Sequence, residues 1–419
     1  MKRYDSYKDS GVKWIREIPS HWKIKKIKYI FEERSEKGFP NEPVLCSTQK
    51  YGVIPQSMYE NRVVVVNKGL DGLKLVRKGD FVISLRSFQG GIEYAHYQGI
   101  ISAAYTILAL NMGINADYMK YLLKSYDFIQ LLQTCVTGIR EGQNINYALL
   151  RKNYIALPSL AEQRAIVSFL DTELGKIDSY MDKEQQLIER LKELKQSLIA
   201  HAVTHGIDPN VKMKPSGIDW IGEIPEHWKL LRAKNMFQRM NRPVRPEDET
   251  ITCFRDGQVT LRKRRRLEGF TESFKEIGYQ GIRKGDLVIH QMDAFAGSIG
   301  VSDSDGKGTP VYICLQPKGS ENNFYYAYLL REMARTGYIK SLYRGIRERS
   351  SDFRFETLAK LFLPIPPASE QRAIVDYLQD KTSKIDKLIT EKTREMEYMK
   401  ELRQRIISDA VTGKIDVRS

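Results

Sequence analysis

The chain has 419 residues, of which 67 are Lys or Arg and 52 are Asp or Glu, so its formal net charge is +15. Hydrophobic residues make up 42%, which is typical of a folded globular protein and excludes a disordered chain. No apolar run reaches the ~20 residues that span a bilayer, no signal-like stretch opens the chain, and its four cysteines stand far apart. We therefore expect a cytoplasmic protein without disulfides whose basic surface binds a polyanion.

The sequence contains one long internal repeat. Four motifs occur twice in the same order, at residues 10–23 and 216–229, 76–83 and 282–289, 138–141 and 345–348, and 162–167 and 370–375. The first of them reads SGVKWIREIPSHWK in one copy and SGIDWIGEIPEHWK in the other. The displacement stays close to half of the chain, from His21 to His227 and from Glu162 to Glu370. Four collinear matches predict a tandem duplication.

The first part of each half, residues 1–155 and 211–362, is predicted to have a mixed structure of strands and helices. Runs rich in β-branched residues at 62–66 and 80–84 predict short strands. These runs alternate with turns that contain Gly and Asn, so we expect an α+β class for both halves.

Two further elements of this first part have counterparts in the repeat. Amphipathic patterns predict one helix over 115–132 and its equivalent over 322–339. The repeated Lys-Gly-Asp sequences predict tight turns at Gly79 and Gly285 that lead into buried strands.

The second part of each half, residues 156–210 and 363–419, is predicted to form one long helix. Prolines precede each helix, at Pro158 and Pro366, where a helix start accepts them and a helix interior does not. An apolar stripe follows with steps of three and four residues, as in a coiled coil. The stripe consists of Leu170, Leu174, Ile177, Met181, Ile188, Leu191, Leu194, Leu198 and Ala202, and then Leu378, Ile385, Ile389, Met396, Met399, Leu402, Ile406 and Ala410.

The two long helices are expected to pack on one another. Each would extend ~65 Å at ~1.5 Å per residue, too far to bury its stripe against its own globular part. The short segment 205–214 cannot carry the chain back along a parallel partner, so we predict an antiparallel pair with an internal pseudo-two-fold axis.

Motifs of catalysis are missing from the sequence. It has no Asp/Asn/Ser-Pro-Pro-aromatic motif of amino-methyltransferases, no phosphate-binding loop and no convincing pair of nucleophile and base. The histidines His201 and His205 have metal-ligand spacing, but a solvated or capping role explains them better. We expect a binding protein with no catalytic residue, no metal and no cofactor of its own.

Basic and amide side chains point to DNA. Arg and Lys bind phosphates, and Arg, Gln and Asn read base edges, so five consecutive bases at 262–266 favour phosphate contact. The candidates for DNA binding are Lys50, Gln56, Arg86, Gln89, Arg140, Gln143, Asn144, Arg255, Gln258, Arg262, Lys263, Arg264, Arg265, Arg266, Gln291, Arg347 and Arg349.

The repeated motifs are expected to serve as scaffold. Both copies keep the same pattern of tryptophans, Trp14 with Trp22 and Trp220 with Trp228, which favours packing over base stacking because two different half-sites require different readers. The discriminating surfaces are then expected in the stretches that differ between the copies, roughly 40–75, 85–110, 245–280 and 290–320.

These motifs together resemble the specificity subunit of Type I restriction–modification enzymes. Trp-Ile-x-Glu-Ile-Pro-x-His-Trp, Arg-Lys-Gly-Asp and Pro-x-x-x-Glu-Gln-x-x-Ile before a long helix each occur twice in the order of that family. The resemblance implies target recognition domains at 1–155 and 211–362, separated by an antiparallel spacer formed by the helical regions 156–210 and 363–419.

The resemblance also implies the partners. The subunit itself would be non-catalytic and would recognise a bipartite, asymmetric site in double-stranded DNA. Modification subunits, expected to be two, would methylate adenine N6 with S-adenosylmethionine, and restriction subunits would translocate and cut DNA with ATP and Mg²⁺.

Docking of these partners is assigned to the helix starts. Six side chains on faces expected to be exposed are candidates: Glu162, Gln163, Arg164, Glu370, Gln371 and Arg372. Helix capping and local ion pairs explain the same residues equally well.

Two other functions stay open at this point. One is a stand-alone DNA-binding or regulatory protein with the same fold, and the other is a self-sufficient DNA methyltransferase with unrecognised motifs. Methyl transfer by the purified chain alone would indicate the latter, and the lack of an adjacent adenine methyltransferase gene would favour the former.

Overall fold

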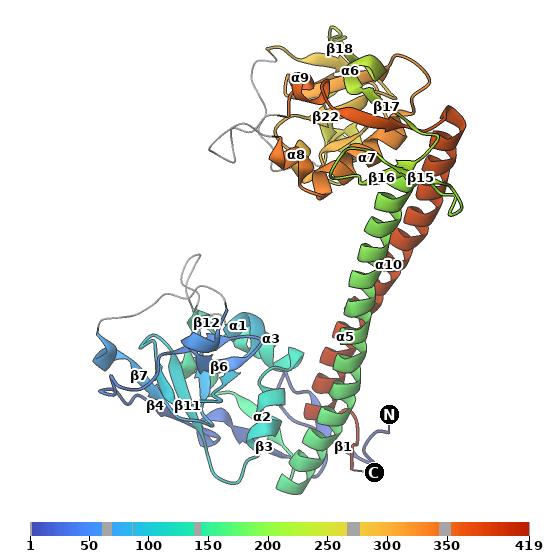
Figure 1. Cartoon of the computed structure of the whole chain (residues 1–419). Helices are drawn as coiled ribbons and strands as arrows, with labels where there is room; N and C mark the ends of the chain where they lie inside the picture. The colour runs from blue at the N-terminus through green and yellow to red at the C-terminus, as the bar shows by residue number, and fades with distance from the viewer. Residues whose placement is uncertain are drawn as a thin grey trace. The chain divides into compact units, whose positions relative to one another are not determined.

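A computed structural model describes residues 2–60, 69–85, 87–137, 144–265, 277–342 and 353–418. The chain divides into two compact units: unit 1 contains residues 1–185 and 393–419, and unit 2 contains residues 186–392. The long helices α5 (Leu160–His205) and α10 (Ala368–Val411) each contribute one part to unit 1 and the other part to unit 2 (Figure 1).

Unit 1 combines short strands with short helices. Its strands are β1 Tyr7–Asp9, β2 Glu17–Pro19, β3 Lys23–Lys26, β4 Phe31–Arg34, β5 Leu45–Thr48, β6 Gly52–Pro55, β7 Lys74–Val76, β8 Phe81–Ile83, β9 Glu93–Tyr94, β10 Gly99–Ile101, β11 Thr106–Leu110, β12 Val136–Thr137, β13 Asn144–Ile145 and β14 Tyr154–Leu157. Its short helices are α1 Ser87–Gly90, α2 Ala116–Leu122, α3 Tyr126–Thr134 and α4 Tyr147–Leu150.

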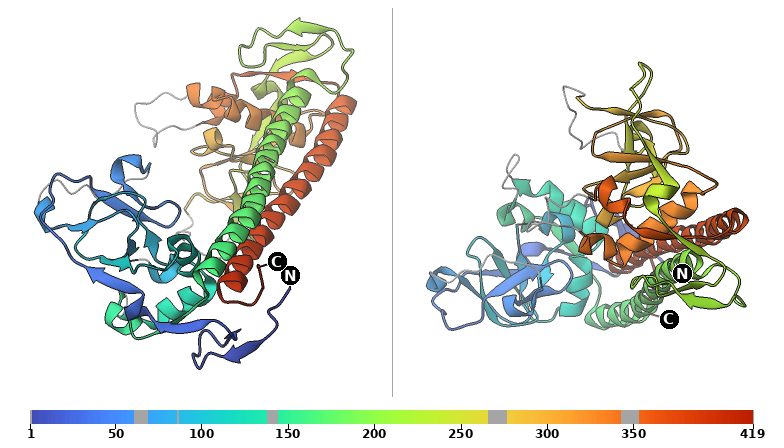
Figure 2. Two further views of the ribbon diagram at one scale, coloured as in Figure 1. Left: turned by 90° about the horizontal axis from the view of Figure 1, so that it is seen from below. Right: turned by 45° about the horizontal axis from the view of Figure 1, so that its top comes forward.

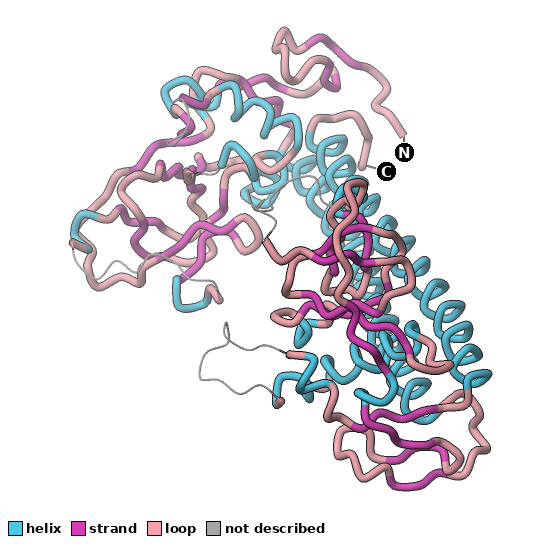
Figure 3. The backbone as a smooth tube through the Cα atoms, turned by 90° about the horizontal axis from the view of Figure 1, so that it is seen from above, coloured by secondary structure: helices cyan, strands magenta, loops and turns pink. Residues whose placement is uncertain are grey.

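Unit 2 repeats this composition (Figure 3). Its strands are β15 Met213–Pro215, β16 Glu223–Pro225, β17 Lys229–Arg232, β18 Phe237–Met240, β19 Ile251–Cys253, β20 Val259–Leu261, β21 Gln280–Ile282, β22 Leu287–His290, β23 Ile299–Val301, β24 Gly306–Gly308, β25 Tyr312–Pro317 and β26 Phe362–Ile365. Its short helices are α6 Ala233–Met236, α7 Asn323–Arg335, α8 Tyr338–Ser341 and α9 Phe355–Leu358.

The strand pairings of unit 1 recur in unit 2. The antiparallel sheet β4-β11-β8-β9 corresponds to β18-β25-β22-β23, and the hairpin β5-β6 corresponds to β19-β20. The strand before each long helix pairs with the strand after the first repeated motif, as β14 with β3 and β26 with β17. The repeated topology confirms the α+β class and the duplication that the sequence predicts.

The predicted strands and turns are confirmed where the structure describes them. The predicted strand at 80–84 forms β8 and is fully buried, and the run at 62–66 lies outside the described residues. Gly79 and Gly285 have φ angles of 99° and 91°, a left-handed conformation that glycine adopts without strain.

The prediction of one helix over 115–132 is wrong, because the chain forms α2 and α3 there. Ser125 interrupts the helix and caps α3, since its hydroxyl accepts a hydrogen bond from the N–H of Phe128. The equivalent prediction over 322–339 is wrong in its last turn: α7 ends at Arg335, and Gly337 with φ 80° precedes α8. Amphipathic periodicity continues across both breaks, so it did not reveal them.

Each unit has its own hydrophobic core, and both long helices contribute to each core. In unit 1, Leu170 and Leu174 of α5 are buried with Ile406 and Ala410 of α10. In unit 2, Ile199 and Ala202 of α5 are buried with Ile374, Val375 and Leu378 of α10.

The segments of α5 and α10 within each unit lie side by side and run antiparallel, as predicted (Figure 2). In unit 1, Arg403 Nε lies 3.1 Å from Asp178 Oδ1. In unit 2, Lys195 Nζ lies 2.6 Å from Asp386 Oδ2. Also in unit 1, the Tyr180 hydroxyl donates to Glu395 at 3.0 Å, so a later residue of α5 contacts an earlier residue of α10.

Two positions of the predicted stripe are wrong. Leu194 and Leu402 have exposed fractions of 49% and 41%. In each helix the next residue, Lys195 or Arg403, contacts the other long helix instead. These side chains are half-buried and form ion pairs with Asp386 and Asp178, respectively. Long cationic side chains can cover apolar surface with their stems, which a pattern of apolar residues alone does not register.

This difference predicts two different costs of truncation. Leu170→Ala is expected to lower the free energy of unfolding by about 2–5 kcal/mol, because Leu170 is completely buried. Leu194→Ala is expected to change it by less than about 0.5 kcal/mol. Thermal unfolding of both variants measures the two losses of stability. Equal losses would contradict the assignment of Leu170 to the buried face and Leu194 to the exposed face of α5.

The two ends of the chain meet in unit 1 (Figure 1). The N–H of Asp416 donates to the carbonyl of Lys2 at 2.9 Å, and the Tyr7 hydroxyl donates to the carbonyl of Lys414 at 3.4 Å. The segment after α10 therefore completes unit 1.

Candidate nucleic-acid interface

The repeated motifs meet at the start of each long helix. In unit 1, Glu162 accepts a hydrogen bond from Trp22 Nε1 at 3.0 Å, and His21 Nε2 lies 2.9 Å from its second oxygen. In unit 2, Glu370 has the same partners, with distances of 3.1 Å to Trp228 Nε1 and 2.8 Å to the His227 ring.

A glycine packs against each of these clusters. In unit 1 it is Gly413, which follows the end of α10, and in unit 2 it is Gly206, which follows the end of α5. A Cβ atom at Gly413 would lie 2.4 Å from Pro19 Cδ, and one at Gly206 would lie 3.0 Å from Glu370 Oε1. Both glycines have positive φ angles, so close approach and backbone conformation both require glycine.

Four of the six predicted docking residues are engaged in this scaffold. Glu162, Gln163 and Gln371 have exposed fractions of only 4%, 3% and 1%, and Glu370 is half-buried. Their expected exposure is therefore wrong.

The two glutamines fasten the helix start to the preceding chain. Gln163 donates to the carbonyl of Pro158 at 3.0 Å and accepts from the N–H of Asn115 at 2.8 Å. Gln371 makes the equivalent bonds to Pro366 and Asn322. Only Arg164 and Arg372 keep the exposed positions that docking requires.

The tryptophan and Lys-Gly-Asp motifs also pack, as the sequence predicts, and the repeated motifs at 138–141 and 345–348 lie outside the described residues. Trp22 and Trp228 are completely buried, and the Trp14 ring contacts Phe128 while Trp220 contacts Tyr338. The aspartates of the Lys-Gly-Asp turns, Asp80 and Asp286, are buried and accept hydrogen bonds from backbone N–H groups at the start of the turn. Both motifs therefore take part in internal packing.

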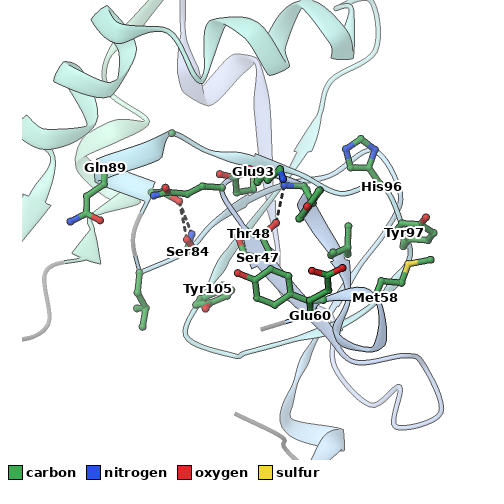
Figure 4. A pocket seen from close by; sticks show the side chains of 18 residues that line it. Ser47, Thr48, Met58, Glu60, Ser84, Gln89, Glu93, His96, Tyr97 and Tyr105 are labelled. Atoms are coloured by element: carbon green, nitrogen blue, oxygen red, sulfur yellow. Dashed lines mark hydrogen bonds between the residues drawn. The ribbon is translucent and has the colours of Figure 1, made fainter. Parts of the chain in front are cut away.

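A cavity of about 1020 Å³ lies in unit 1, within the stretches that differ between the copies. Two predicted DNA-binding residues, Lys50 and Gln89, line it and are exposed. Figure 4 shows Glu93 between Gln89 and His96 in this view of the cavity.

Two other candidates of unit 1, Gln56 and Asn144, do not line this cavity. Gln56 is half-buried after β6, and Asn144 is exposed on β13. Arg86, Arg140 and Gln143 lie outside the described residues.

Sequence reasoning missed two acidic residues in the cavity wall, the exposed Glu60 and the buried Glu93. Glu93 has an exposed fraction of 2%, and its Oε2 lies 2.6 Å from Lys124 Nζ. Burial raises the pKa of Glu93 to about 7, and the neighbouring Lys124 moderates this rise. A charged residue between the hydrophobic residues Ile92 and Tyr94 was the available signal.

The raised pKa of Glu93 predicts a pH-dependent stability. A proton binds Glu93 more tightly in the folded protein than in the unfolded chain, so this contribution to stability is full below about pH 4.5 and is lost as the pH rises through 7. Between about pH 5 and about pH 8, the free energy of unfolding of the native protein is expected to fall by about 3 kcal/mol more than that of the Glu93→Gln variant.

Thermal unfolding of both proteins across this pH range measures the difference. His96, whose pKa is lowered by burial, is present in both proteins and cancels. If the difference in stability between the two proteins did not change with pH, the raised pKa of Glu93 would be contradicted.

The basic cluster of unit 2 is largely paired with neighbouring acids. Lys263, Arg264 and Arg265 form ion pairs with Glu249, Asp303 and Asp256, respectively. The pairs are exposed and thus individually weak, so phosphate groups can compete for the cations.

Arg265 makes the most elaborate of these contacts. Its guanidinium lies 4.3 Å from the centre of the Phe254 ring and donates to Asp256 and Gln258. The hydrogen bond from Arg265 lowers the pKa of Asp256.

Three further candidates of unit 2 are among the described residues. Arg262 donates to the Thr252 hydroxyl, Arg255 pairs with Asp293 at 3.0 Å, and Gln291 is half-buried. Arg266, Arg347 and Arg349 lie outside the described residues.

The cysteines and histidines of the described chain form no further site. All four cysteines are buried free thiols. The His201 and His205 rings stack, and no group of three His, Cys, Asp or Glu side chains within the described ranges is placed to hold a metal ion. Among the described helices, none combines the length and apolar character that crossing a membrane requires.

Known sequences show similarity over the whole chain. The family model of the Type I restriction modification DNA specificity domain matches residues 19–192 and 281–398. The chain is 23% identical over 446 residues to the Type I restriction enzyme MjaVIII specificity subunit of Methanocaldococcus jannaschii, covering 99% of this chain and 98% of the relative. It is 24% identical over 408 residues to the EcoBI specificity subunit of Escherichia coli, covering 83% and 81%.

Two solved structures share the fold. A chain of a type I R-M system, studied for its complex assembly and conformational transition, superimposes with a TM-score of 0.68 at 17% identity, covering 95% of this chain and 99% of that one. The HsdS subunit of Thermoanaerobacter tengcongensis gives a TM-score of 0.53 at 17% identity, covering 95% and 98%.

Proposed function

Because this chain belongs to the family of type I restriction–modification DNA specificity proteins, whose members are non-catalytic DNA-recognition subunits, we propose that each of its two units reads one half of a bipartite, asymmetric DNA site. The observation that carries this proposal is that the two units share the same buried scaffold but have different candidate DNA-binding surfaces. The Glu162 and Glu370 clusters are alike, whereas the cavity residues of unit 1 and the basic cluster of unit 2 differ.

The different surfaces assign different DNA-contacting residues to the two units. Lys50 and Gln89 at the cavity of unit 1, and Arg262 to Arg265 in unit 2, are proposed to contact DNA. Lys and Arg contribute affinity through phosphates, while the amides contribute discrimination through base edges. Two unlike readers on one scaffold suit two unlike half-sites.

The family assembles with modification and restriction subunits on DNA. We propose that this chain directs two modification subunits, which methylate adenine N6 with S-adenosylmethionine, and restriction subunits, which use ATP and Mg²⁺. Methylation of a stacked adenine requires its extrusion into a pocket of the methylating subunit. Arg164 and Arg372 are the proposed docking residues that remain exposed.

Reconstitution tests this proposal. The purified chain is expected to bind DNA without transferring a methyl group from labelled S-adenosylmethionine, and modification subunits are expected to methylate a defined site only in its presence. Methyl transfer by the chain alone would overturn the proposal.

Neutralising the basic cluster is expected to weaken DNA binding without changing the preferred sequence. The triple variant Lys263→Gln, Arg264→Gln, Arg265→Gln should reduce the slope of log affinity against log salt by about 0.9 for each phosphate that the variant no longer neutralises. Fluorescence anisotropy at several salt concentrations measures this slope.

A matched control removes the same charge elsewhere. Lys176, Lys192 and Lys384 form ion pairs within the long helices, and changing all three to Gln should leave the slope nearly unchanged. Equal slopes for the two triple variants would show that the cluster does not contact phosphates.

A further inference from the structure

The cavity of unit 1 contains an acceptor atom that the fold does not use. Glu93 Oε2 pairs with Lys124, but no hydrogen-bond partner for Oε1 exists among the described residues. A buried acceptor without a partner costs free energy, so its retention points to a donor that arrives with a ligand.

The other walls of the cavity suit a flat, polar ligand. Four tyrosines line it, Tyr51, Tyr59, Tyr97 and Tyr105, together with the Ser47 hydroxyl, which has no hydrogen-bond partner among the described residues. Aromatic side chains stack on bases that have left the helix, and hydroxyl and amide groups bond to base edges. Lys50 at the rim provides a positive charge for a phosphate of the same strand.

The second unit lacks this acid at the equivalent place. Glu93 lies opposite Val82 in the sheet of unit 1, and Gly300 lies opposite the corresponding Val288 in unit 2. A Cβ atom at Gly300 would lie 1.9 Å from the carbonyl oxygen of Gly257, so no side chain fits there. The carboxylate is therefore a feature of one reader and not of the shared scaffold.

The cation beside Glu93 has a counterpart in unit 2. Tyr118 and Tyr325 donate equivalent hydrogen bonds to the ends of the long helices, and Lys124 and Arg331 each follow six residues later. Arg331 thus occupies the position of Lys124 without an opposing glutamate from the strand. The equivalent sites therefore carry different charged groups, which suits two different half-sites.

We propose that the cavity of unit 1 receives one unstacked base of its half-site, adenine, cytosine or guanine, and that Glu93 accepts a hydrogen bond from the exocyclic amino group of that base. This inference rests on the proposed function of unit 1 as a DNA reader. When ionised, the Glu93 carboxylate accepts hydrogen bonds and repels phosphates. Adenine, cytosine and guanine each carry an exocyclic amino group that can donate to it, and thymine carries none.

The burial of Glu93 requires the base to leave the stack. With an exposed fraction of 2%, its carboxylate cannot reach an edge that stays inside the duplex, so the base must enter the cavity. Unstacking costs a few kcal/mol, which stacking on the tyrosines can offset.

The test combines variants of Glu93 with deletion of the amino group from DNA. The full chain with its modification subunits is titrated at pH 8, where Glu93 is mostly ionised, with duplexes in which one base at a time lacks its amino group. Adenine is replaced by purine, cytosine by 2-pyrimidinone and guanine by hypoxanthine. At one position of the first half-site this deletion is expected to weaken binding by the native protein about tenfold. The cost should shrink in Glu93→Gln and vanish in Glu93→Leu, and 2-aminopurine beside that position should brighten on binding.

Controls separate this inference from its premise. Glu332, which is also buried and ion-paired but lies in unit 2, serves as the matched site. In the Glu332→Gln variant, deletion of the amino group should still weaken DNA binding about tenfold. Circular dichroism verifies the folding of each variant. Absence of any site preference in the native complex would defeat the proposed function itself.

Two results would overturn the inference alone. One is an equal cost of amino-group deletion in the native protein and in Glu93→Leu. The other is weakened assembly with modification subunits at unchanged base preference, which would make the cavity a protein-docking site.

Discussion

Replacing residues 1–155 by the corresponding segment of a relative with a different target is expected to change one half of the recognised site completely and to leave the other half unchanged. The reason is that unit 1 and unit 2 have separate cores and separate candidate surfaces. The segment ends before Ser159, so α5 and its Glu162 are retained and can receive the incoming His-Trp motif. The methylated motif, read by sequencing of modified bases, measures the outcome.

The reciprocal exchange of residues 211–362 is the matched control. It should alter only the other half-site, because Glu370 and α10 stay in place to receive the incoming motif. A change in both halves after either exchange would mean that the two units do not read independently.

Trp22→Ala is expected to lower the stability of unit 1 by about 3–5 kcal/mol, since the indole is fully buried and donates to Glu162. The loss includes an acceptor left buried without its donor. Trp228→Ala should have an equivalent cost in unit 2.

Calorimetry of both variants measures these costs. Tyr29, with an exposed fraction of 63%, provides an aromatic control whose truncation should cost less than about 0.5 kcal/mol. A comparably small cost for Trp22→Ala would contradict its role as an anchor.

The features that the sequence predicts well are those with a repeat or a period. The duplicated motifs revealed the repeated units, and the steps of three and four revealed α5 and α10. The packing role of Trp22 and Trp228 followed from the identity of the two copies.

The features that it did not predict depend on contacts between distant parts of the chain. The role of Glu162 arises from a partner 140 residues away, so the exposure of the helix start was misjudged. The ion pairs of Lys263 and Arg264, and the burial of Glu93, likewise depend on how strands are brought together. The break at Ser125 is a local capping event inside an uninterrupted apolar pattern.

Sequencing of modified bases in a host with and without this chain tests the central claim most directly. We predict that removing the chain abolishes one bipartite N6-methyladenine motif, with two unlike halves separated by unspecified bases. An unchanged set of motifs, or loss of a motif with a single continuous recognition sequence, would contradict the account.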